Sequence, residues 1–107
     1  MSSLDEWVED INESGKVILV EGINDIRALR RIGVKNDIVS LSRMAIFEVV
    51  EELSGMEVVI LTDFDKKGKE LYGKLNSGLQ NVGVKVDHKF REWLQRNTKI
   101  SCIEGLR

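Results

Sequence analysis

Two short, almost entirely apolar runs constrain the fold of this chain more than any other feature of its sequence. One covers residues 17–20 and the other residues 58–61, and both consist of valine, isoleucine and leucine. A strand with one face in water alternates apolar and polar residues, whereas an uninterrupted apolar run of this length is typical of a strand buried on both faces. We therefore expect a parallel sheet that helices cover on both sides.

Helical patterns alternate with these strands along the chain. The first half is expected to hold a helix after the N-cap Ser3, a strand over 17–20, a helix over 24–32 and a weaker strand over 37–41. The second half is expected to hold a helix capped by Ser42 with Ile46, Val49, Val50 and Leu53 on its inner face, a strand over 57–62, a helix ending at Gly83, a strand over 84–86 and a last helix around 90–94. This alternation predicts a compact, Rossmann-like α/β fold with a four-stranded, mostly parallel sheet, for which we take the order 2-1-3-4, with the first and third strands as neighbours.

Composition limits the class of protein further. We expect 107 residues with 42% hydrophobic content to form one domain over 1–107, with an N-terminal helix in 1–15, a core in 16–87 and a C-terminal helix and tail in 88–107. The 16 basic and 18 acidic residues give a net charge of −2, which excludes a polycation but not a local basic patch. One cysteine and one histidine exclude an intrachain disulfide and zinc sites built from several such ligands. With no leader and no long apolar run, the chain is expected to be cytoplasmic and to have no membrane partner.

Acidic residues gather where the buried strands are expected to end. Glu21 directly follows the first strand, Asp25 lies one helical turn beyond it, and Asp63 and Asp65 follow the third strand. The carboxyl ends of parallel strands meet at one edge of a sheet, so in the order 2-1-3-4 these side chains converge. Like charges disfavour one another at short range, and a hard cation with oxygen ligands relieves that repulsion. The pattern predicts a site for Mg²⁺, which Mn²⁺ can replace, formed by Glu21, Asp63 and Asp65 with Asp25 as a further candidate.

Each of these acids also has a purely structural interpretation. Glu21 taken alone can be a strand-end carboxylate that faces water. Asp25 falls in the first turn of a helix, where the macrodipole favours an acid whatever its function. Asp63 or Asp65 can cap the helix that follows. The presence of both motifs after two buried strands favours the metal site over these separate explanations.

Glycines and basic residues beside the acids indicate contacts to phosphate. Gly22 leaves room for a tight turn or for a phosphate at a helix N-terminus. Gly68 lies in the first turn of a helix, where a glycine costs stability and therefore indicates close backbone approach. The residues assigned to phosphate or nucleic-acid contact are Gly22, Arg27, Arg31, Lys66, Lys67 and Gly68. The basic ones among them can equally be solvated helix surface, and the same alternative holds for the basic C-terminal region that includes Arg91.

These residues resemble the signature of the Toprim domain, which is shared by topoisomerases, bacterial primases, recombination proteins, OLD-type nucleases and a small ribonuclease that matures ribosomal RNA. That signature is a glutamate after the first strand and D-x-D after the third, matched here by Val20-Glu21-Gly22-x-x-Asp25 and Thr62-Asp63-Phe64-Asp65-x-x-Gly68. The resemblance extends from about Lys16 to Asp87. The layout is similar to that of small stand-alone Toprim proteins of archaea and some bacteria, whose chains end near a segment like Glu104-Gly105-Leu106.

The resemblance implies a role for each acid and a class of reaction. Asp63 and Asp65 would coordinate Mg²⁺, and Glu21 would be a ligand or a general acid/base. The reaction implied is phosphodiester cleavage or nucleotidyl transfer in RNA or DNA processing, while a topoisomerase or a primase is not expected because their further catalytic regions are missing. One alternative is a non-catalytic nucleic-acid-binding subunit or a partner of a larger processing or repair complex. Separately, a protein partner or a homodimer is a candidate assembly for so small a chain. Another is a phospho-acceptor domain resembling a response-regulator receiver, which the order of the acids disfavours.

Overall fold

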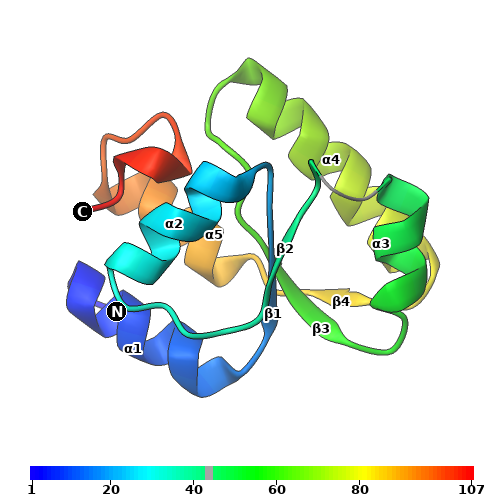
Figure 1. The fold of residues 1–107 in the computed structure, drawn as a ribbon, viewed down its shortest axis with the longest axis horizontal. Helices are drawn as coiled ribbons and strands as arrows, with labels where there is room; N and C mark the ends of the chain where they lie inside the picture. The colour runs from blue at the N-terminus through cyan, green and yellow to red at the C-terminus, as the bar shows by residue number, and fades with distance from the viewer. Residues whose placement is uncertain (43–44) are drawn as a thin grey trace.

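Four parallel strands form the centre of the structure, and helices connect them (Figure 1). The computed structural model describes residues 1–42 and 45–107. In chain order its elements are α1 (Leu4–Ser14), β1 (Val17–Val20), α2 (Ile23–Arg31), β2 (Ile38–Ser40), α3 (Ile46–Glu52), β3 (Glu57–Ile60), α4 (Lys66–Asn81), β4 (Lys85–Val86), α5 (Lys89–Asn97) and the 3-10 turn η1 (Ile103–Gly105). The predicted alternation of strands and helices is confirmed.

The strand order is β2-β1-β3-β4, as predicted, and every neighbouring pair is parallel. The central strand β1 pairs with both β2 and β3, so that Ile18 lies opposite Ile38 on one side and Val59 on the other. The order reverses at β1, because the chain adds β2 to one side of it and β3 and β4 to the other. Parallel strands of this kind place their carboxyl ends at a common edge.

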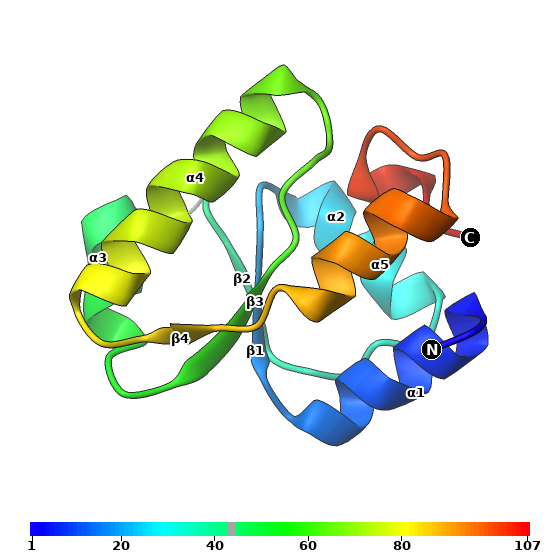
Figure 2. The ribbon, with the colours of Figure 1, turned by 180° about the vertical axis from the view of Figure 1, so that it is seen from behind.

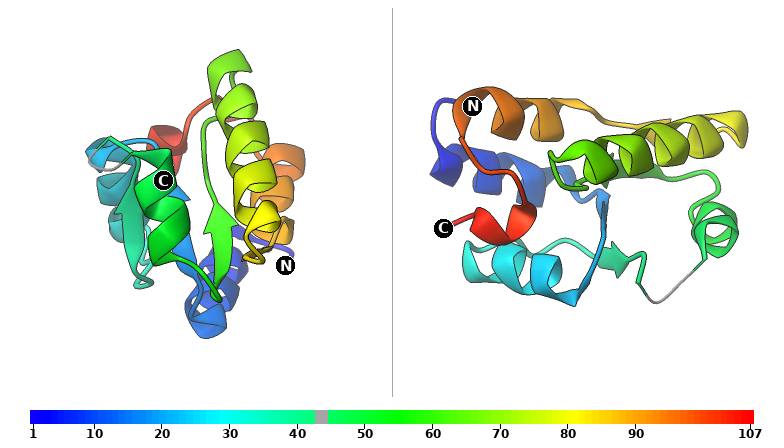
Figure 3. Two further views of the ribbon diagram at one scale, coloured as in Figure 1. Left: turned by 90° about the vertical axis from the view of Figure 1, so that its right-hand side faces the viewer. Right: turned by 90° about the horizontal axis from the view of Figure 1, so that it is seen from above.

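The apolar side chains of the sheet are divided between two cores, as the uninterrupted apolar runs predict. Ile18 and Val59 point to the face that α1, α2 and α5 cover, whereas Leu19 and Val58 point to the face that α3 and α4 cover. Figures 2 and 3 show these two groups of helices on opposite sides of the strands. No helix within the described ranges combines the length and the apolar character needed to cross a membrane.

Helix α1 is attached to the body of the protein by its buried tryptophan. The Trp7 indole N–H donates to the Phe90 carbonyl at 2.9 Å, and the two rings meet edge to face at a centroid distance of 6.0 Å. Both side chains are fully buried. The helix begins as predicted, because the Ser3 hydroxyl accepts from the Glu6 N–H at 3.2 Å. Trp7 and Phe90 are therefore part of the core that α1, α2 and α5 form on this face of the sheet.

The start of the third helix differs from the prediction. Helix α3 begins at Ile46 with Ala45 as its N-cap, so Ser42 does not cap it. The Ser42 hydroxyl instead lies 2.7 Å from that of Ser40, and the Ser42 N–H donates to the Glu21 carbonyl at 3.1 Å. Ile46 was expected on the inner face, but it is exposed, because the buried residues of this region, Val49 and Leu53, come from the later turns.

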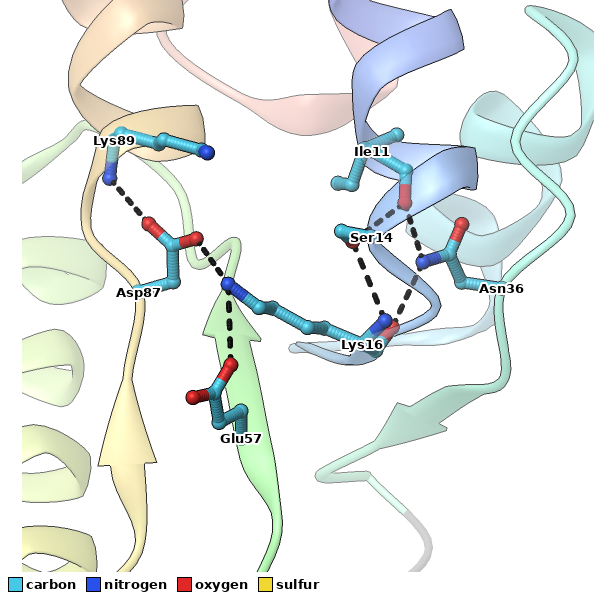
Figure 4. Close-up of polar contacts among 7 residues, drawn as sticks. All are labelled: Ile11, Ser14, Lys16, Asn36, Glu57, Asp87 and Lys89. Atoms are coloured by element: carbon cyan, nitrogen blue, oxygen red, sulfur yellow. Dashed lines mark hydrogen bonds and ion pairs between the residues drawn. The ribbon is translucent and has the colours of Figure 1, made fainter.

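A lysine links three segments on the side of the sheet away from the carboxyl edge (Figure 4). The Lys16 ammonium lies 2.6 Å from a carboxylate oxygen of Asp87 and 3.3 Å from one of Glu57. Burial alone would raise the pKa of Asp87, but hydrogen bonds from Lys16 and from the Lys89 N–H outweigh it, and the pKa is lowered. The Asn36 amide donates to the Lys16 carbonyl at 2.8 Å, so the backbone of Lys16, between α1 and β1, is also held in place.

Replacing Asp87 by Asn should lower the free energy of unfolding at pH 7 by about 1–3 kcal/mol, because Lys16 loses its closest anion. A depressed carboxyl pKa stabilises the fold above the unfolded value near 4, and that contribution is lost as the pH falls through the folded value. Urea denaturation should therefore show that Asp87→Asn has a lower free energy of unfolding than wild type at pH 7, and that this difference shrinks towards pH 3. Glu57→Gln is the matched control, with a cost below about 0.5 kcal/mol because that side chain is 49% exposed. Equal deficits for Asp87→Asn at both pH values would contradict the assignment.

Candidate functional site at the carboxyl edge of the sheet

Glu21 and Asp63 meet at the edge where β1 and β3 end. The strands remain hydrogen-bonded up to this point, since the Leu61 N–H donates to the Leu19 carbonyl at 2.8 Å. Two residues later a carboxylate oxygen of Glu21 accepts from the Asp63 N–H at 2.7 Å. The predicted approach of the two motifs is therefore seen as a direct contact between a side chain of one and the backbone of the other.

The loop that carries Asp63 and Asp65 is held by backbone contacts on each side. The Asp63 carboxylate accepts from the Ile103 N–H at 2.9 Å. The Phe64 N–H donates to the Ser101 carbonyl at 2.9 Å, so the C-terminal segment runs alongside the loop. The Asp65 carboxylate accepts from the Gly68 N–H at 2.7 Å, which makes Asp65 the N-cap of α4. The capping interpretation of Asp65 is confirmed, and it leaves the second carboxylate oxygen for another contact.

Gly68 is a glycine because the Asp63 backbone lies against it. A Cβ at position 68 would lie 2.1 Å from the Asp63 carbonyl oxygen, a separation that no side chain permits. The Thr62 hydroxyl donates to the Gly68 carbonyl at 2.8 Å and closes the same turn. The close backbone approach inferred from the sequence is confirmed. Gly22 differs, because its backbone is in the extended region and a Cβ there would meet nothing within 4 Å. A positive φ or a close contact therefore does not require glycine here, and Gly22 serves as the N-cap of α2, while its contact with phosphate stays a prediction.

Arg91 has a position at this edge that the sequence does not predict. The sequence leaves it either as a phosphate contact or as solvated helix surface, but it is 6% exposed. One guanidinium nitrogen donates to the Asp63 carbonyl at 2.8 Å. The guanidinium also lies 4.7 Å from the centre of the Phe64 ring and 4.5 Å from that of Tyr72. No local signal distinguishes it, because the two rings and the carbonyl come from segments remote in the sequence.

Asp25 is buried beneath this edge and caps the start of α2. Its carboxylate accepts from the Gly22 N–H at 3.0 Å, and the residue is 5% exposed. Burial is the largest cause that raises the pKa of Asp25 to about 6, and the negative charges of Asp63, Glu104 and Glu21 add to it. The structural interpretation of Asp25 is thus supported. Glu104, to which the sequence assigned no role, belongs to the same acidic edge.

Oxygen donors gather at this edge, and they are the ligands that Mg²⁺ prefers. Glu21, Asp63 and Asp65 each use one carboxylate oxygen for a backbone N–H, and the second oxygen receives no hydrogen bond from the described residues. Across 1–42 and 45–107, however, no three His, Cys, Asp or Glu side chains are grouped so that they could hold a metal ion. The expected three-carboxylate group is thus not assembled among these residues, although each of the three side chains is fixed by a backbone contact. The residues fit the water-rich coordination of Mg²⁺, for which one or two carboxylates suffice.

The carboxylates at this edge disfavour one another's negative charge. Partial burial is the largest cause that raises the pKa of Glu21, and the charges of Asp63 and Asp65 act in the same direction against the hydrogen bond from the Asp63 N–H. Arg91 is a buried cation that interacts with these acids, and burial lowers its pKa while the charges of Asp63 and Glu21 oppose that change. An arginine stays protonated in proteins. It therefore supplies one fixed positive charge to an edge with several negative ones.

The predicted phosphate-binding residues are not all brought to this edge. Lys66 and Lys67 are exposed in the first turn of α4, directly after Asp65. Arg27 is exposed on α2 and contacts the Asn24 side chain at 3.3 Å. Arg31 is the last residue of α2, about 12 Å along the helix from its N-terminus, and lines a groove with residues of α1. The structure thus separates Arg31 from the acidic edge, because α2 runs away from it.

The fold and this edge define a doubly wound α/β protein with an acidic cluster at the point where the strand order reverses. No protein-family model matches the chain. A UPF0292 protein of Thermococcus sibiricus is 39% identical over 106 residues, which are 96% of this chain and 84% of that protein. A UPF0292 protein of Thermococcus gammatolerans is 42% identical over 104 residues, covering 94% of this chain and 78% of that protein. The chain therefore belongs to the UPF0292 family.

A solved structure of an Aquifex aeolicus protein has the same architecture. It superposes with a TM-score of 0.89 at 34% identity, over 99% of this chain and 100% of that one. The likeness extends over the whole chain, so it includes the C-terminal segment that lies along the Asp63 loop. These comparisons support the fold, and the chemistry rests on the residues of the site.

Asp25→Asn should make the protein more stable at neutral pH in EDTA. A carboxyl whose folded pKa is raised binds more protons in the folded state between about pH 4 and 6, so its contribution to stability falls as the pH rises through that window. Asn keeps an acceptor for the Gly22 N–H and removes the charge. The stability difference between variant and wild type, measured by urea denaturation, should grow from near zero at pH 4 to at most about 3 kcal/mol at pH 7. A difference that does not change with pH would contradict the buried charge.

Arg91→Met should lower the free energy of unfolding by about 1–3 kcal/mol, because the Asp63 carbonyl loses its donor while the apolar stem is kept. The amide resonances of Asp63 and Phe64 should shift and broaden, since the loop loses a contact on its inner side. Arg96→Met, at a side chain that is 76% exposed, is the control and should change stability by less than about 0.5 kcal/mol. Wild-type stability in Arg91→Met would refute the anchoring role.

Proposed function

We propose that this protein is a Toprim-type, Mg²⁺-dependent protein that acts on nucleic acid, by cleaving or transferring phosphodiesters in RNA or DNA processing. The observation that carries the proposal is the contact at the carboxyl edge, where the Glu21 carboxylate binds the Asp63 backbone at 2.7 Å and Asp65 follows on the same loop. The backbone contacts of Glu21, Asp63 and Asp65 fix the side chains in place. An acid after each of two adjacent parallel strands is also the arrangement that the Toprim signature implies.

Each acid keeps one carboxylate oxygen for a cation and uses the other to fix its position. A bound Mg²⁺ would polarise the scissile phosphate and lower the pKa of a bound water. Asp63 and Asp65 are the proposed ligands, since the loop that bears them is fastened by Ile103 and by the cap of α4. Partial burial raises the pKa of Glu21, which is the direction that favours proton transfer by a carboxyl group, so we assign it as ligand or general acid/base.

Phosphate would be bound by the surroundings of the acids. The N-terminus of α2 begins at Gly22, where the chain leaves open space for an anion at the positive end of the helix dipole. Lys66 and Lys67 add positive charge on the opposite side of the edge. Asp25 has a supporting role, because it holds the start of α2. The cytoplasmic location and a homodimer or protein partner remain predictions from the sequence.

The second candidate function is metal-dependent nucleic-acid binding without turnover. It is favoured by one observation, namely that no three-ligand group is assembled among the described residues. A binding protein needs the metal only as a bridge between carboxylates and phosphate, and a bridge tolerates fewer ligands. This candidate predicts retention of RNA or DNA that EDTA abolishes, with no product formed at any Mg²⁺ or Mn²⁺ concentration.

Conservative variants separate chemistry from folding. Glu21→Gln, Asp63→Asn and Asp65→Asn each keep an acceptor for the backbone N–H, and Asn is as good an N-cap as Asp. We expect each to cut turnover of a susceptible substrate by at least about 100-fold with unchanged circular dichroism and unfolding midpoint. The assay uses single- and double-stranded RNA and DNA with Mg²⁺ or Mn²⁺.

Glu13→Gln is the matched control, since it removes one exposed carboxylate from α1 far from the edge. It should cleave like wild type. Manganese titration followed by amide-resolved NMR gives a readout that does not depend on the substrate, because broadening should centre on Glu21, Asp63 and Asp65. Cleavage of no substrate together with broadening elsewhere would disprove the proposed site.

A further inference from the structure

We propose that the exposed lysine face of α4 binds the sugar-phosphate backbone of a nucleic-acid strand that passes over the acidic edge. The lysine face is defined by Lys66, Lys67, Lys69 and Lys74, with Gly73 and Ser77 between and beyond the lysines. All six residues are exposed. The inference rests on the proposed function and extends it, since it assigns the path and the mode of recognition of the substrate.

Helix α4 is basic, although the chain as a whole carries a small negative net charge. Its 16 residues carry four lysines and one acid, Glu70, whereas the whole protein has a net charge of −2. Ion pairs within the described ranges involve only Lys16 and Arg96 as cations, so the α4 lysines have no carboxylate partner there. A row of unpaired ammonium groups on one helix is the electrostatic footprint of a polyanion.

A glycine in the middle of this face indicates a close approach from outside. Gly73 lies in the interior of a long helix, where glycine costs about 1 kcal/mol relative to alanine. Its backbone is helical and a Cβ would meet nothing within 4 Å, so no contact within the chain requires the glycine. The side chains around it form a shallow hollow lined by Lys69, Glu70, Gly73, Lys74 and Ser77. A strand seated there would reach the helix backbone, with a lysine on either side.

The lysine face begins at the proposed catalytic edge and has the length of several nucleotides. Asp65 caps α4, and the first two lysines follow it directly. From Lys66 to Lys74 the helix rises about 12 Å, whereas successive phosphates of one duplex strand advance about 3.4 Å. The face therefore spans about three to four phosphates. Figure 1 shows α4 running from this edge back over the outside of the sheet.

Recognition on this face would be by charge alone. The exposed residues of α4 are lysine, glutamate, glycine, serine, glutamine and asparagine, none of which stacks on a base. Tyr72 is the aromatic residue of the helix, and its ring is occupied by Arg91 and His88. Contacts to phosphate position a strand and carry no sequence information. Binding should therefore be independent of sequence and steeply dependent on salt.

A second copy of this chain is the competing occupant, because α1 exposes five acids that would complement the lysines. The nucleic-acid assignment is preferred because the lysine face is continuous with the acidic edge, whereas α1 is attached on the opposite side of the sheet. The two occupants differ in a measurable way. Self-association through α4 would give a concentration-dependent dimer in sedimentation equilibrium, and neutralising the lysines would abolish it.

The main test compares the double variant Lys69→Gln/Lys74→Gln with wild type and with Lys35→Gln/Lys85→Gln, which removes two exposed lysines elsewhere. Fluorescence anisotropy with a labelled 20-nucleotide single-stranded RNA and a 20-base-pair DNA is recorded over a series of salt concentrations. The α4 variant should bind about 10-fold more weakly at moderate salt, and its log–log salt slope should fall by about 1.4–1.8, which corresponds to two lost phosphate contacts. The control should stay within twofold of wild type for both probes.

Gly73→Leu separates binding from stability. Leucine is a better helix former than glycine and has free space here, so the unfolding midpoint should rise. Its side chain fills the hollow and should weaken binding of the same RNA by about fivefold. A variant that is more stable and binds less well cannot be explained by loss of fold. Gly73→Ala is the intermediate case, expected to be stabilised with a smaller loss of binding.

Failure of this inference is distinguishable from failure of the proposed function. Unchanged binding by Lys69→Gln/Lys74→Gln overturns the lysine face, even where Asp63→Asn abolishes cleavage. Weakened binding by the lysine variant supports the lysine face, even where no metal-dependent product forms. Absence of any binding by wild type, or a dimer that the lysine variant abolishes, overturns the inference.

Discussion

The parallel pairing of β1 with β3 is the interaction on which the rest of this structure depends. It buries the most apolar segments of the chain on both faces, and it divides the helices into two groups around them. It also brings the residues after two distant strands to one edge, where Glu21 contacts the Asp63 backbone. Hydrophobic burial thus sets the positions of the carboxylates. The strand register that buries the apolar side chains on both faces also places the residues after β1 and β3 side by side.

The acidic edge is stabilised from outside the sheet. Arg91 of α5 and the backbone of the C-terminal segment hold the Asp63 loop in place. Without them the loop would carry two carboxylates against Glu21 and Asp25 with little to offset their repulsion, which the raised pKa values of the latter two reflect. A site that keeps several acids together at a cost in stability is typical of function, since evolution retains such strain where charge is needed.

The distribution of charge over this protein says more about its candidate function than the net charge does. A net charge of −2 conceals an acidic edge, an acidic α1 and a basic face on α4. The proposed substrate path combines two of these, with lysines that would attract a polyanion and carboxylates that would hold the cation acting on it. Membership of the UPF0292 family and the likeness to the Aquifex aeolicus structure extend this fold to relatives in which the same arrangement can be tested.

Sequence alone determined the features that depend on local pattern. The apolar runs specified buried parallel strands, and the helices followed with small errors at their ends. The approach of Glu21 to the Asp63 backbone and the close contact at Gly68 were predictable because strand ends are visible in a linear pattern. Only the tertiary structure decided that Arg91 is buried against Asp63, that Glu104 joins the acidic edge and that Arg31 lies away from it. Each of these depends on contacts between segments far apart in the chain, which no local periodicity encodes.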